Sequence, residues 1–392
     1  MTPAARVQAA IELLDMVIDG ARNQGAPADR LIAAYFKQRR YAGSKDRRAV
    51  RDLVYRAIRY CGPIPRTGRA AMLALAQADE EIAALFDGST HGPPAIGKNE
   101  KPAIAGTAPD WLVRELDQSG VSGEVAAAML GRASLDVRVN TLKADRDGLD
   151  LPEPAEKLEA PNALRLAAGT NVDQWDEYRD GKIEVQDHGS QMACIAANAR
   201  GGETVIDLCA GAGGKTLSLA AAMGNMGELI ACDTDRGRLS KLTPRANRAG
   251  AGMIQTRLLD PKSELEALED YAEAADLVLV DAPCSGTGTW RRKPEGKWRL
   301  TAKTLDAYAR LQDELLEIAA KLTKPGGRIA FVTCSLLDSE GTDRIAAFLE
   351  RNEGFSAEAP TVPLGNPHGL GIRLDPLRHG TDGFFVAIVR RA

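Results

Sequence analysis

Two cysteines stand at positions that favour a reactive thiol. Cys284 follows the apolar run Leu277-Val-Leu-Val-Asp281-Ala-Pro, and Cys334 follows Phe331-Val-Thr. A structural cysteine usually lies buried within a strand, whereas both of these come after a strand-like run and directly before a serine. Because the carboxyl ends of parallel strands meet at one edge of a sheet, we predict that the two thiols project into one cleft.

A thiolate in such a cleft suits one particular chemistry. Carbon 5 of cytosine takes up a methyl group only after a thiolate adds to carbon 6, which makes carbon 5 nucleophilic enough to attack a sulfonium methyl. A base must then remove the carbon 5 proton so that the cysteine is expelled. A carboxyl group near ring nitrogen 3 would stabilise the adduct, and Asp281 stands three residues before Cys284. Methylation of an adenine amino group needs no cysteine and typically uses an aromatic residue that Asp281-Ala-Pro-Cys284 lacks.

A glycine turn follows the first strand-like run and predicts a ligand site. The turn comprises Cys209, Ala210, Gly211, Ala212, Gly213, Gly214 and Lys215. A Walker A loop would require glycine at the position of Cys209, and a dinucleotide fingerprint would require it at Thr216, so both patterns fail. A turn of this kind also holds the methionine part of S-adenosylmethionine, and the glycines alone leave a nucleotide and this methyl donor as alternatives.

Two further strand ends carry carboxylates that suit a nucleoside. Asp233 closes the second run and is placed to accept hydrogen bonds from both ribose hydroxyls, although it could instead cap the following helix. Asp260 closes the third run and could hold an adenine amino group or act as a cap. Their register with the glycine turn strengthens the prediction of a cofactor site.

The elements that position these residues predict an α/β domain. From residue 203 onward, short apolar runs alternate with helix-sized intervals, as in a mostly parallel, buried sheet with right-handed crossovers. We therefore predict a Rossmann-like domain over residues 191–392, with the run Phe384–Arg391 as an edge strand.

The part before this domain divides into three segments. Residues 1–88 show helical apolar spacing without strand-like runs, which predicts an all-helical domain. Residues 89–109 are rich in Gly, Pro and small residues and are predicted to be a linker. Residues 110–190 mix helical and strand-like segments and are predicted to form an α+β connector.

Composition limits the class of protein. No CxxC or Cys/His cluster occurs among the six cysteines, so we expect neither a metal site nor a disulfide framework. The chain contains no apolar stretch long enough for a membrane span and begins without a signal-peptide pattern, so we expect a cytoplasmic protein, most simply a monomer.

The net charge of -4 hides two basic runs. The candidates for contacts with nucleic-acid phosphates are Arg39, Arg40, Arg47, Arg48, Arg291, Arg292 and Lys293. For any single one, a solvated helix face is the alternative; as a cluster they favour RNA. Trp290 and Trp298 flank the second run and could stack on a base or belong to the core.

The motifs together resemble a known family. VIDLCAGAGGKT, ACDTDRGRL, LVLVDAPCSGTGTWRRKPEGKW and FVTCS are similar to segments of the bacterial Sun/Fmu (RsmB-like) family of ribosomal RNA cytosine-5 methyltransferases. TAPDWLVRELDQ, ASLDVRVNTLK and KIEVQDHGSQMA resemble the segment before the catalytic domain of that family, and DRRAVRDLVYRAIRYCG resembles its NusB-like helical RNA-binding domain. The chain departs from the family at Ala212, where the family usually has Pro, which removes no ligand group.

The resemblance implies roles that the residues alone leave open. The cysteine of the TCS element is the nucleophile in this family and that of the DAPC element assists product release, which correspond to Cys334 and Cys284. The cofactor contacts correspond to positions 209 to 215, Asp233, Asp260 and Asp281. The family also implies methylation of 16S ribosomal RNA with S-adenosylmethionine.

Two other functions stay open. A transfer RNA cytosine-5 methyltransferase would carry the same motifs. A non-catalytic, nucleotide-dependent RNA-binding module would use the glycine turn for a phosphate and leave the cysteines incidental.

Overall fold

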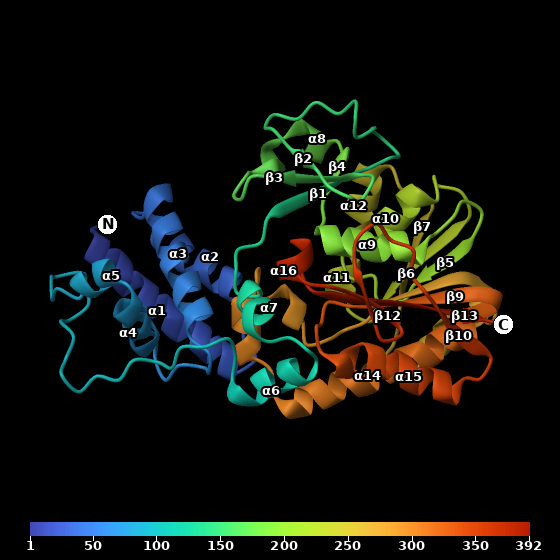
Figure 1. The fold of residues 1–392 in the computed structure, drawn as a ribbon. Helices are drawn as coiled ribbons and strands as arrows, with labels where there is room; N and C mark the ends of the chain where they lie inside the picture. Colours follow the sequence, from blue (N-terminus) through green and yellow to red (C-terminus); the bar gives the residue numbers. More distant parts are fainter. The chain divides into compact units, whose positions relative to one another are not determined.

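The computed structural model describes all 392 residues, which divide into two compact units. The helical unit comprises residues 1–131 and 289–301, and the sheet unit comprises residues 132–288 and 302–392. Figure 1 shows the helical unit in blue and cyan, with the orange segment 289–301 within it. None of the helices has the length and apolar character needed to span a bilayer.

Helices make up the body of the first unit, as predicted for residues 1–88. They are α1 (Pro3–Arg22), α2 (Ala28–Gln38), α3 (Ser44–Tyr60), α4 (Gly68–Ala78), α5 (Glu80–Ala84), α6 (Asp110–Gln118) and α7 (Gly123–Ala128). Thr2 starts α1 as an N-cap whose side chain accepts a hydrogen bond from the amide of Ala5. Val7, Leu14 and Ile18 recur at helical spacing and are buried, so one stripe of α1 forms the centre of the core.

The predicted linker, residues 89–109, contains no helix or strand, but it is attached to the helices by backbone hydrogen bonds. The amide of Ala103 donates to the carbonyl of Ala70, and the amide of Gly62 donates to the carbonyl of Ile104. The segment is therefore a packed part of the helical unit.

Segment 289–301 belongs to the helical unit although it follows the cysteine loop in sequence. The indole of Trp298 donates to the carbonyl of Gly62, and Glu295 accepts a hydrogen bond from the amide of Ala28. Trp290 and Trp298 are 0% and 6% exposed, so of the two predicted alternatives the structure supports core packing. This division differs from the predicted boundaries, because composition does not reveal that a short segment packs against helices more than 200 residues earlier.

The sheet unit is built on a large mixed sheet, as predicted. Its parallel strands are β5 (Thr204–Asp207), β6 (Glu228–Asp233), β7 (Ile254–Leu258), β8 (Ala275–Asp281) and β9 (Thr323–Thr333), and its antiparallel strands are β10 (Phe355–Glu358), β11 (Asn366–His368), β12 (Gly371–Leu374) and β13 (Phe384–Arg391). The strand order is β11-β12-β13-β9-β8-β5-β6-β7, with β10 also paired to β13.

Helices cover both faces of this sheet (Figure 1). One layer contains α9 (His188–Ala197), α10 (Gly214–Ala222) and α12 (Leu242–Ala249), and the other contains α14 (Ala302–Leu322) and α15 (Thr342–Arg351). Alternate residues of a strand face opposite layers: Leu277 and Leu279 pack with the first layer, and Val278 and Val280 with the second. The apolar runs of the sequence therefore reflect burial on both faces.

The prediction that Phe384–Arg391 forms an edge strand is wrong. This strand, β13, pairs with β9 on one side and with β12 and β10 on the other. Phe384 to Val389 are all buried, which is the pattern of an interior strand. The short strands that cover its outer side have few apolar residues and gave no sequence signal.

The connector adds a second, antiparallel sheet to the sheet unit. Its order is β2-β3-β1-β4, formed by β2 (Glu156–Lys157), β3 (Ala163–Leu166), β1 (Leu135–Val139) and β4 (Ile183–Val185). Val137, Leu164 and Ile183 belong to a separate apolar cluster. The α+β character predicted for this region is thus found between residues 132 and 190.

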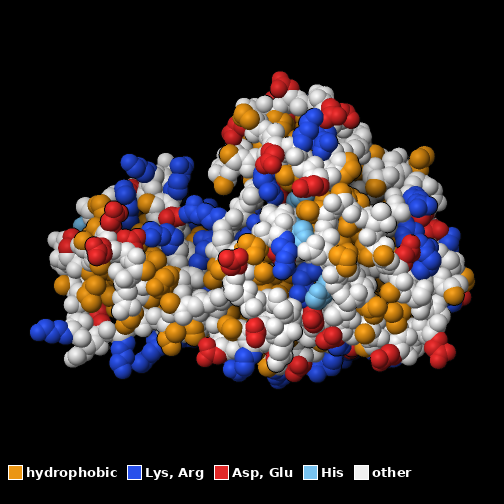
Figure 2. Space-filling model, viewed as in Figure 1, with side chains coloured by type: hydrophobic (Ala, Val, Ile, Leu, Met, Phe, Trp, Pro, Cys, Tyr) orange, Lys and Arg blue, Asp and Glu red, His pale blue; other side chains and the backbone are white.

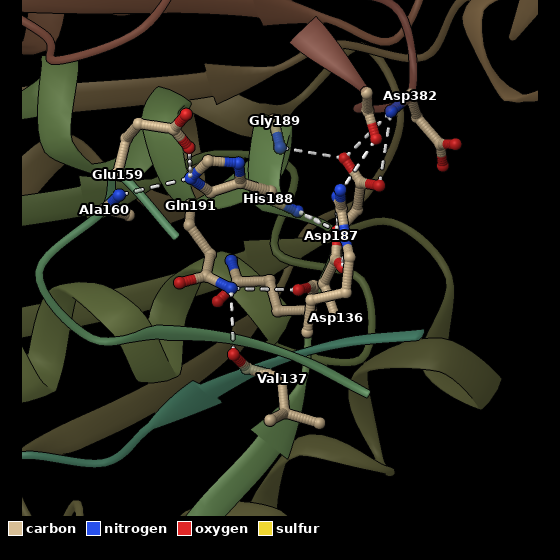
Figure 3. Close-up of polar contacts among 12 residues, drawn as sticks. Asp136, Val137, Glu159, Ala160, Asp187, His188, Gly189, Gln191 and Asp382 are labelled. Carbon is tan, nitrogen blue, oxygen red and sulfur yellow. Dashed lines mark hydrogen bonds and ion pairs between the residues drawn. The ribbon is translucent and has the colours of Figure 1, made fainter. Parts of the chain in front are cut away.

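A buried polar cluster joins the connector sheet to the start of α9, which packs on the large sheet (Figure 3). Both oxygens of Asp136 accept hydrogen bonds from Arg165, and one also accepts from the amide of His188. His188 is 1% exposed, burial lowers the pKa of its ring, and its Nε2 accepts from the amide of Ala160. His188 is therefore a neutral structural residue.

We expect Asp136→Ala to destabilise the sheet unit strongly. The side chain of Asp136 is fully buried, and its removal leaves the guanidinium of Arg165 without its carboxylate, a change that typically costs about 3–5 kcal/mol. Urea unfolding measures the loss. Asp147→Ala, which breaks the exposed pair with Lys157, is the control and should leave the midpoint unchanged. Equal midpoints for both variants would contradict the structural role of Asp136.

Candidate active site

The glycine turn after β5 requires two of its glycines. Gly211 and Gly213 have φ values of 56° and 86°, which side chains rarely adopt. A Cβ on Gly213 would lie 2.0 Å from Cδ1 of Leu242, and one on Gly211 would lie 2.5 Å from a guanidinium nitrogen of Arg238. Gly214 differs, because a Cβ there would meet nothing within 4 Å. The turn is thus packed against Leu242 and Arg238 at Gly213 and Gly211, and it is open beside Gly214.

Asp233, at the end of β6, holds this turn in place. One carboxylate oxygen accepts from the amide of Gly211 at 2.7 Å, and the other accepts from the amide of Asp235, also at 2.7 Å. Asp235 itself caps the short helix α11 (Arg236–Leu239). The structure therefore assigns the cap to Asp235 and gives Asp233 a role in shaping the turn. Each oxygen keeps a second lone pair for a ligand.

Asp207, at the end of β5, is a member of the site that the sequence reasoning passed over. Its carboxylate accepts from the hydroxyl of Thr216 at 2.6 Å, and burial raises its pKa to about 7. Its other oxygen is buried without a hydrogen-bond partner. Asp207 therefore ties the end of β5 to the first turn of α10.

Lys215 and Asp281 form an ion pair across the turn. Nζ of Lys215 lies 2.7 Å from the carboxylate of Asp281. Burial alone would lower the pKa of Lys215, but Asp281 outweighs burial and raises it, so the lysine is charged. The side chain of Asp281 is 31% exposed and that of Lys215 is 11% exposed, so the carboxylate is the more accessible partner.

Asp260 lies two residues after β7, at the same edge of the sheet, and is exposed.

The two cysteines lie together, as predicted. Cys284 and Cys334 follow the adjacent parallel strands β8 and β9, and their sulfur atoms are 3.4 Å apart. Both residues are free thiols of intermediate exposure. The hydrogen bond with Cys334 and burial raise the pKa of Cys284 well above its ordinary value. Cys284 therefore stays protonated and can donate its hydrogen to the sulfur of Cys334.

A chain of backbone contacts fixes the loop that carries Cys334. The amide of Gly288 donates to the carbonyl of Cys334, and the amide of Gly383 donates to the carbonyl of Gly288. Residue 383 is held in turn by its neighbour, because the carboxylate of Asp187 accepts from the amide of Asp382 (Figure 3). A Cβ on Gly288 would lie 2.1 Å from the carbonyl oxygen of Gly383, so this approach requires glycine. These contacts thus link Asp187, in the polar cluster beneath the connector, to the backbone of Cys334.

The basic residues predicted to contact RNA lie on the helical unit. Figure 2 shows Lys and Arg side chains gathered over the region of α2 and α3. Arg40, Arg47 and Arg48 are exposed, whereas Arg39 is half-buried, stacks on the ring of Tyr35 and pairs with Glu12.

In the second run, Arg291 is only 6% exposed, Arg292 is half-buried and Lys293 is exposed. The structure does not test phosphate contacts for any of these residues, and they stay predictions.

The fold and the site together define a Rossmann-like methyltransferase. A family model described as "16S rRNA methyltransferase RsmB/F" matches residues 194–390. This chain belongs to the RsmB/F family. Membership of a methyltransferase family confirms the predicted cofactor, S-adenosylmethionine, and the predicted resemblance.

Similar proteins agree with this assignment. The chain is 32% identical to the probable ribosomal RNA small subunit methyltransferase B of Synechocystis, over 72% of this chain and 67% of that protein. It is also 32% identical to the protein of the same name from Bacillus subtilis, over 72% of this chain and 66% of that protein. The chain thus spans about two thirds of the length of these curated relatives. Among solved structures, that of PH0851 covers 100% of this chain and 99% of its own, with a TM-score of 0.77 and 26% identity.

The two neighbouring glycines of the turn should respond differently to alanine. Gly213→Ala places a methyl group against Leu242 in a left-handed backbone conformation, and we expect a loss of about 1–3 kcal/mol. Gly214→Ala meets no atom and starts helix α10, so thermal unfolding should be unchanged or slightly raised. Equal melting temperatures for the two variants would contradict the turn geometry.

Proposed function

We propose that this protein is an RNA cytosine-5 methyltransferase, with 16S ribosomal RNA as its substrate and Cys334 as the nucleophile. One observation carries the proposal: two thiols lie 3.4 Å apart at the ends of adjacent parallel strands, at the sheet edge that carries the Lys215–Asp281 pair. Adenine amino methylation has no use for these thiols, whereas attack on carbon 6 of cytosine requires one.

The residues of the turn fit S-adenosylmethionine. The open side of Gly214 gives a ligand room to approach the backbone of the turn. Asp233 and Asp281 end the two strands that flank β5, and Asp260 lies two residues beyond β7; at these places they would hold the ribose and the base of the cofactor. When bound, the cofactor supplies a sulfonium methyl group.

The thiols divide the work of attack and release. The thiolate of Cys334 would add to carbon 6 of the cytosine, ring nitrogen 3 would take up a proton from water, and Asp281 would stabilise the adduct by accepting a hydrogen bond from that nitrogen. Cys284, whose pKa is raised mainly by its bond with Cys334, is a thiol during this attack. Once Cys334 is a neutral thioether, it holds the hydrogen of Cys284 less strongly, so the pKa of Cys284 falls and Cys284 can release its proton to water and become a thiolate. Cys284 can then take part in removing the carbon 5 proton, in line with the role of the DAPC cysteine in the resembling family.

The RNA would reach the site with help from the helical unit. The exposed side chains of Arg40, Arg47 and Arg48 offer phosphate contacts that carry no sequence information. The target cytosine would have to leave its stack to reach the thiol. These contacts follow from charge and exposure, and the NusB-like character of the unit follows from resemblance alone.

Two cysteine variants test the mechanism. Cys334→Ala should abolish methyl transfer and all covalent adduct with RNA, because the neighbouring thiol, Cys284, serves release and does not attack. Cys284→Ala should still attack and should accumulate a protein–RNA adduct that survives denaturing electrophoresis. Methyl incorporation from labelled S-adenosylmethionine measures turnover in parallel. An adduct in Cys334→Ala but not in Cys284→Ala would exchange the two roles.

Calorimetric titration separates the enzyme from a nucleotide-binding module. The wild-type protein should bind S-adenosylmethionine and should not bind ATP tightly. Gly214→Ala should fold normally but bind the methyl donor more weakly, because its added methyl group occupies the open side of the turn. Tight ATP binding together with indifference to the methyl donor would overturn the proposed function.

A further inference from the structure

Behind the two thiols lies a buried carboxylate that the proposed mechanism does not use. Glu340 is 0% exposed and belongs to the short turn η5 (Asp338–Glu340) after the Cys334 loop. Its Oε1 accepts from the amide of Ser285 at 2.8 Å, and its Oε2 accepts from the hydroxyl of Ser285 at 2.5 Å. Burying a carboxylate at this depth is costly, and its hydrogen bonds offset part of that cost.

The bonds of Glu340 reach both cysteine loops through the residues next to the cysteines. Ser285 directly follows Cys284, and its hydroxyl lies 3.2 Å from the hydroxyl of Ser335, which directly follows Cys334. The hydroxyl of Thr287 lies 3.1 Å from that of Ser335 and accepts from the amide of Leu336. Side-chain bonds therefore cross from one loop to the other immediately behind the sulfur atoms.

Helix α14 closes this network from the other side. The side-chain amide of Gln312 donates to the carbonyl of Pro283 at 2.9 Å and to Glu340 at 3.4 Å. Gln312 is 0% exposed, so these bonds are shielded from water. The residue before Cys284 and the residue after it are thus both tied to Glu340.

We propose that Glu340 is a positioning residue, whose carboxylate holds the Cys284 and Cys334 loops in the register that brings the two thiols together. This inference rests on the proposed function only for its catalytic consequence. The geometric part concerns the thiols themselves and can be tested without RNA or cofactor.

The charge of Glu340 also affects a second measurable quantity, the pKa of Cys284. Three donors surround its oxygens, as suits an ionised carboxylate, although burial raises its pKa above the ordinary value. Its negative charge contributes to the raised pKa of Cys284, after the bond with Cys334, burial and the charge of Cys334. The other titratable groups that face the pair are Tyr308 from α14 and Lys215 from α10. Removing the charge of Glu340 should therefore lower the pKa of Cys284.

Glu340→Gln separates positioning from simple stability. Alkylation of Cys284 by iodoacetamide, followed by peptide mass spectrometry over a pH series, should show a midpoint below that of the wild-type protein. Methyl transfer should fall about 10- to 100-fold in kcat with KM for RNA unchanged, as expected for the loss of bonds to a charged group. Ser339→Ala changes the neighbouring residue of the same turn, whose hydroxyl has no partner, and should change neither quantity.

Glu340→Asp provides the second variant. It keeps the negative charge but its carboxylate is one methylene shorter, so the alkylation midpoint should stay close to that of the wild-type protein while kcat falls. An unchanged alkylation profile in Glu340→Gln, or an unchanged kcat in both variants, would overturn the inference. Failure of the proposed function has a different signature, namely absence of methyl transfer by the wild-type protein, with the alkylation results unaffected.

Discussion

The parallel pairing of β8 with β9 is the constraint on which the site depends. Because the two strands run in the same direction and in fixed register, with Asp281 opposite Val332, their carboxyl ends lie side by side. A thiol placed just beyond each strand then has a partner thiol within contact distance, although 50 residues separate them in sequence. An antiparallel neighbour would place one of the two cysteines at the opposite edge of the sheet.

The same edge brings charges into a space with little water, and hydrogen bonds balance each one. Lys215 stays charged because Asp281 offsets its burial, and Glu340 keeps its charge among three donors. Asp233 uses both of its oxygens on backbone amides. A site arranged in this way needs little reorganisation when a substrate arrives, which is how fixed dipoles and charges assist a reaction.

The parts of the fold with a strong local signal could be predicted from the sequence. The runs that form β5, β6 and β8 are apolar because both faces are buried, and the turn glycines stand where the backbone adopts positive φ. What escaped prediction depends on distant packing: the interior position of β13, the role of Asp233 as a brace for the turn, and Glu340, whose partner Ser285 lies 55 residues away. A lone glutamate after a TCS element carries no pattern that distinguishes it from a surface residue.

Residues 289–301 interrupt the sheet unit and pack in the helical unit, so no single cut separates the two units. Because these residues leave the sheet unit directly after Gly288 and return at Ala302, the polypeptide passes between the two units three times. A fragment that begins at residue 132 would contain Trp298 and Lys297. It would lack the carbonyls of Gly62 and Thr107 to which these two side chains donate. Separating the two units therefore requires cutting the chain at three places, after residues 131, 288 and 301.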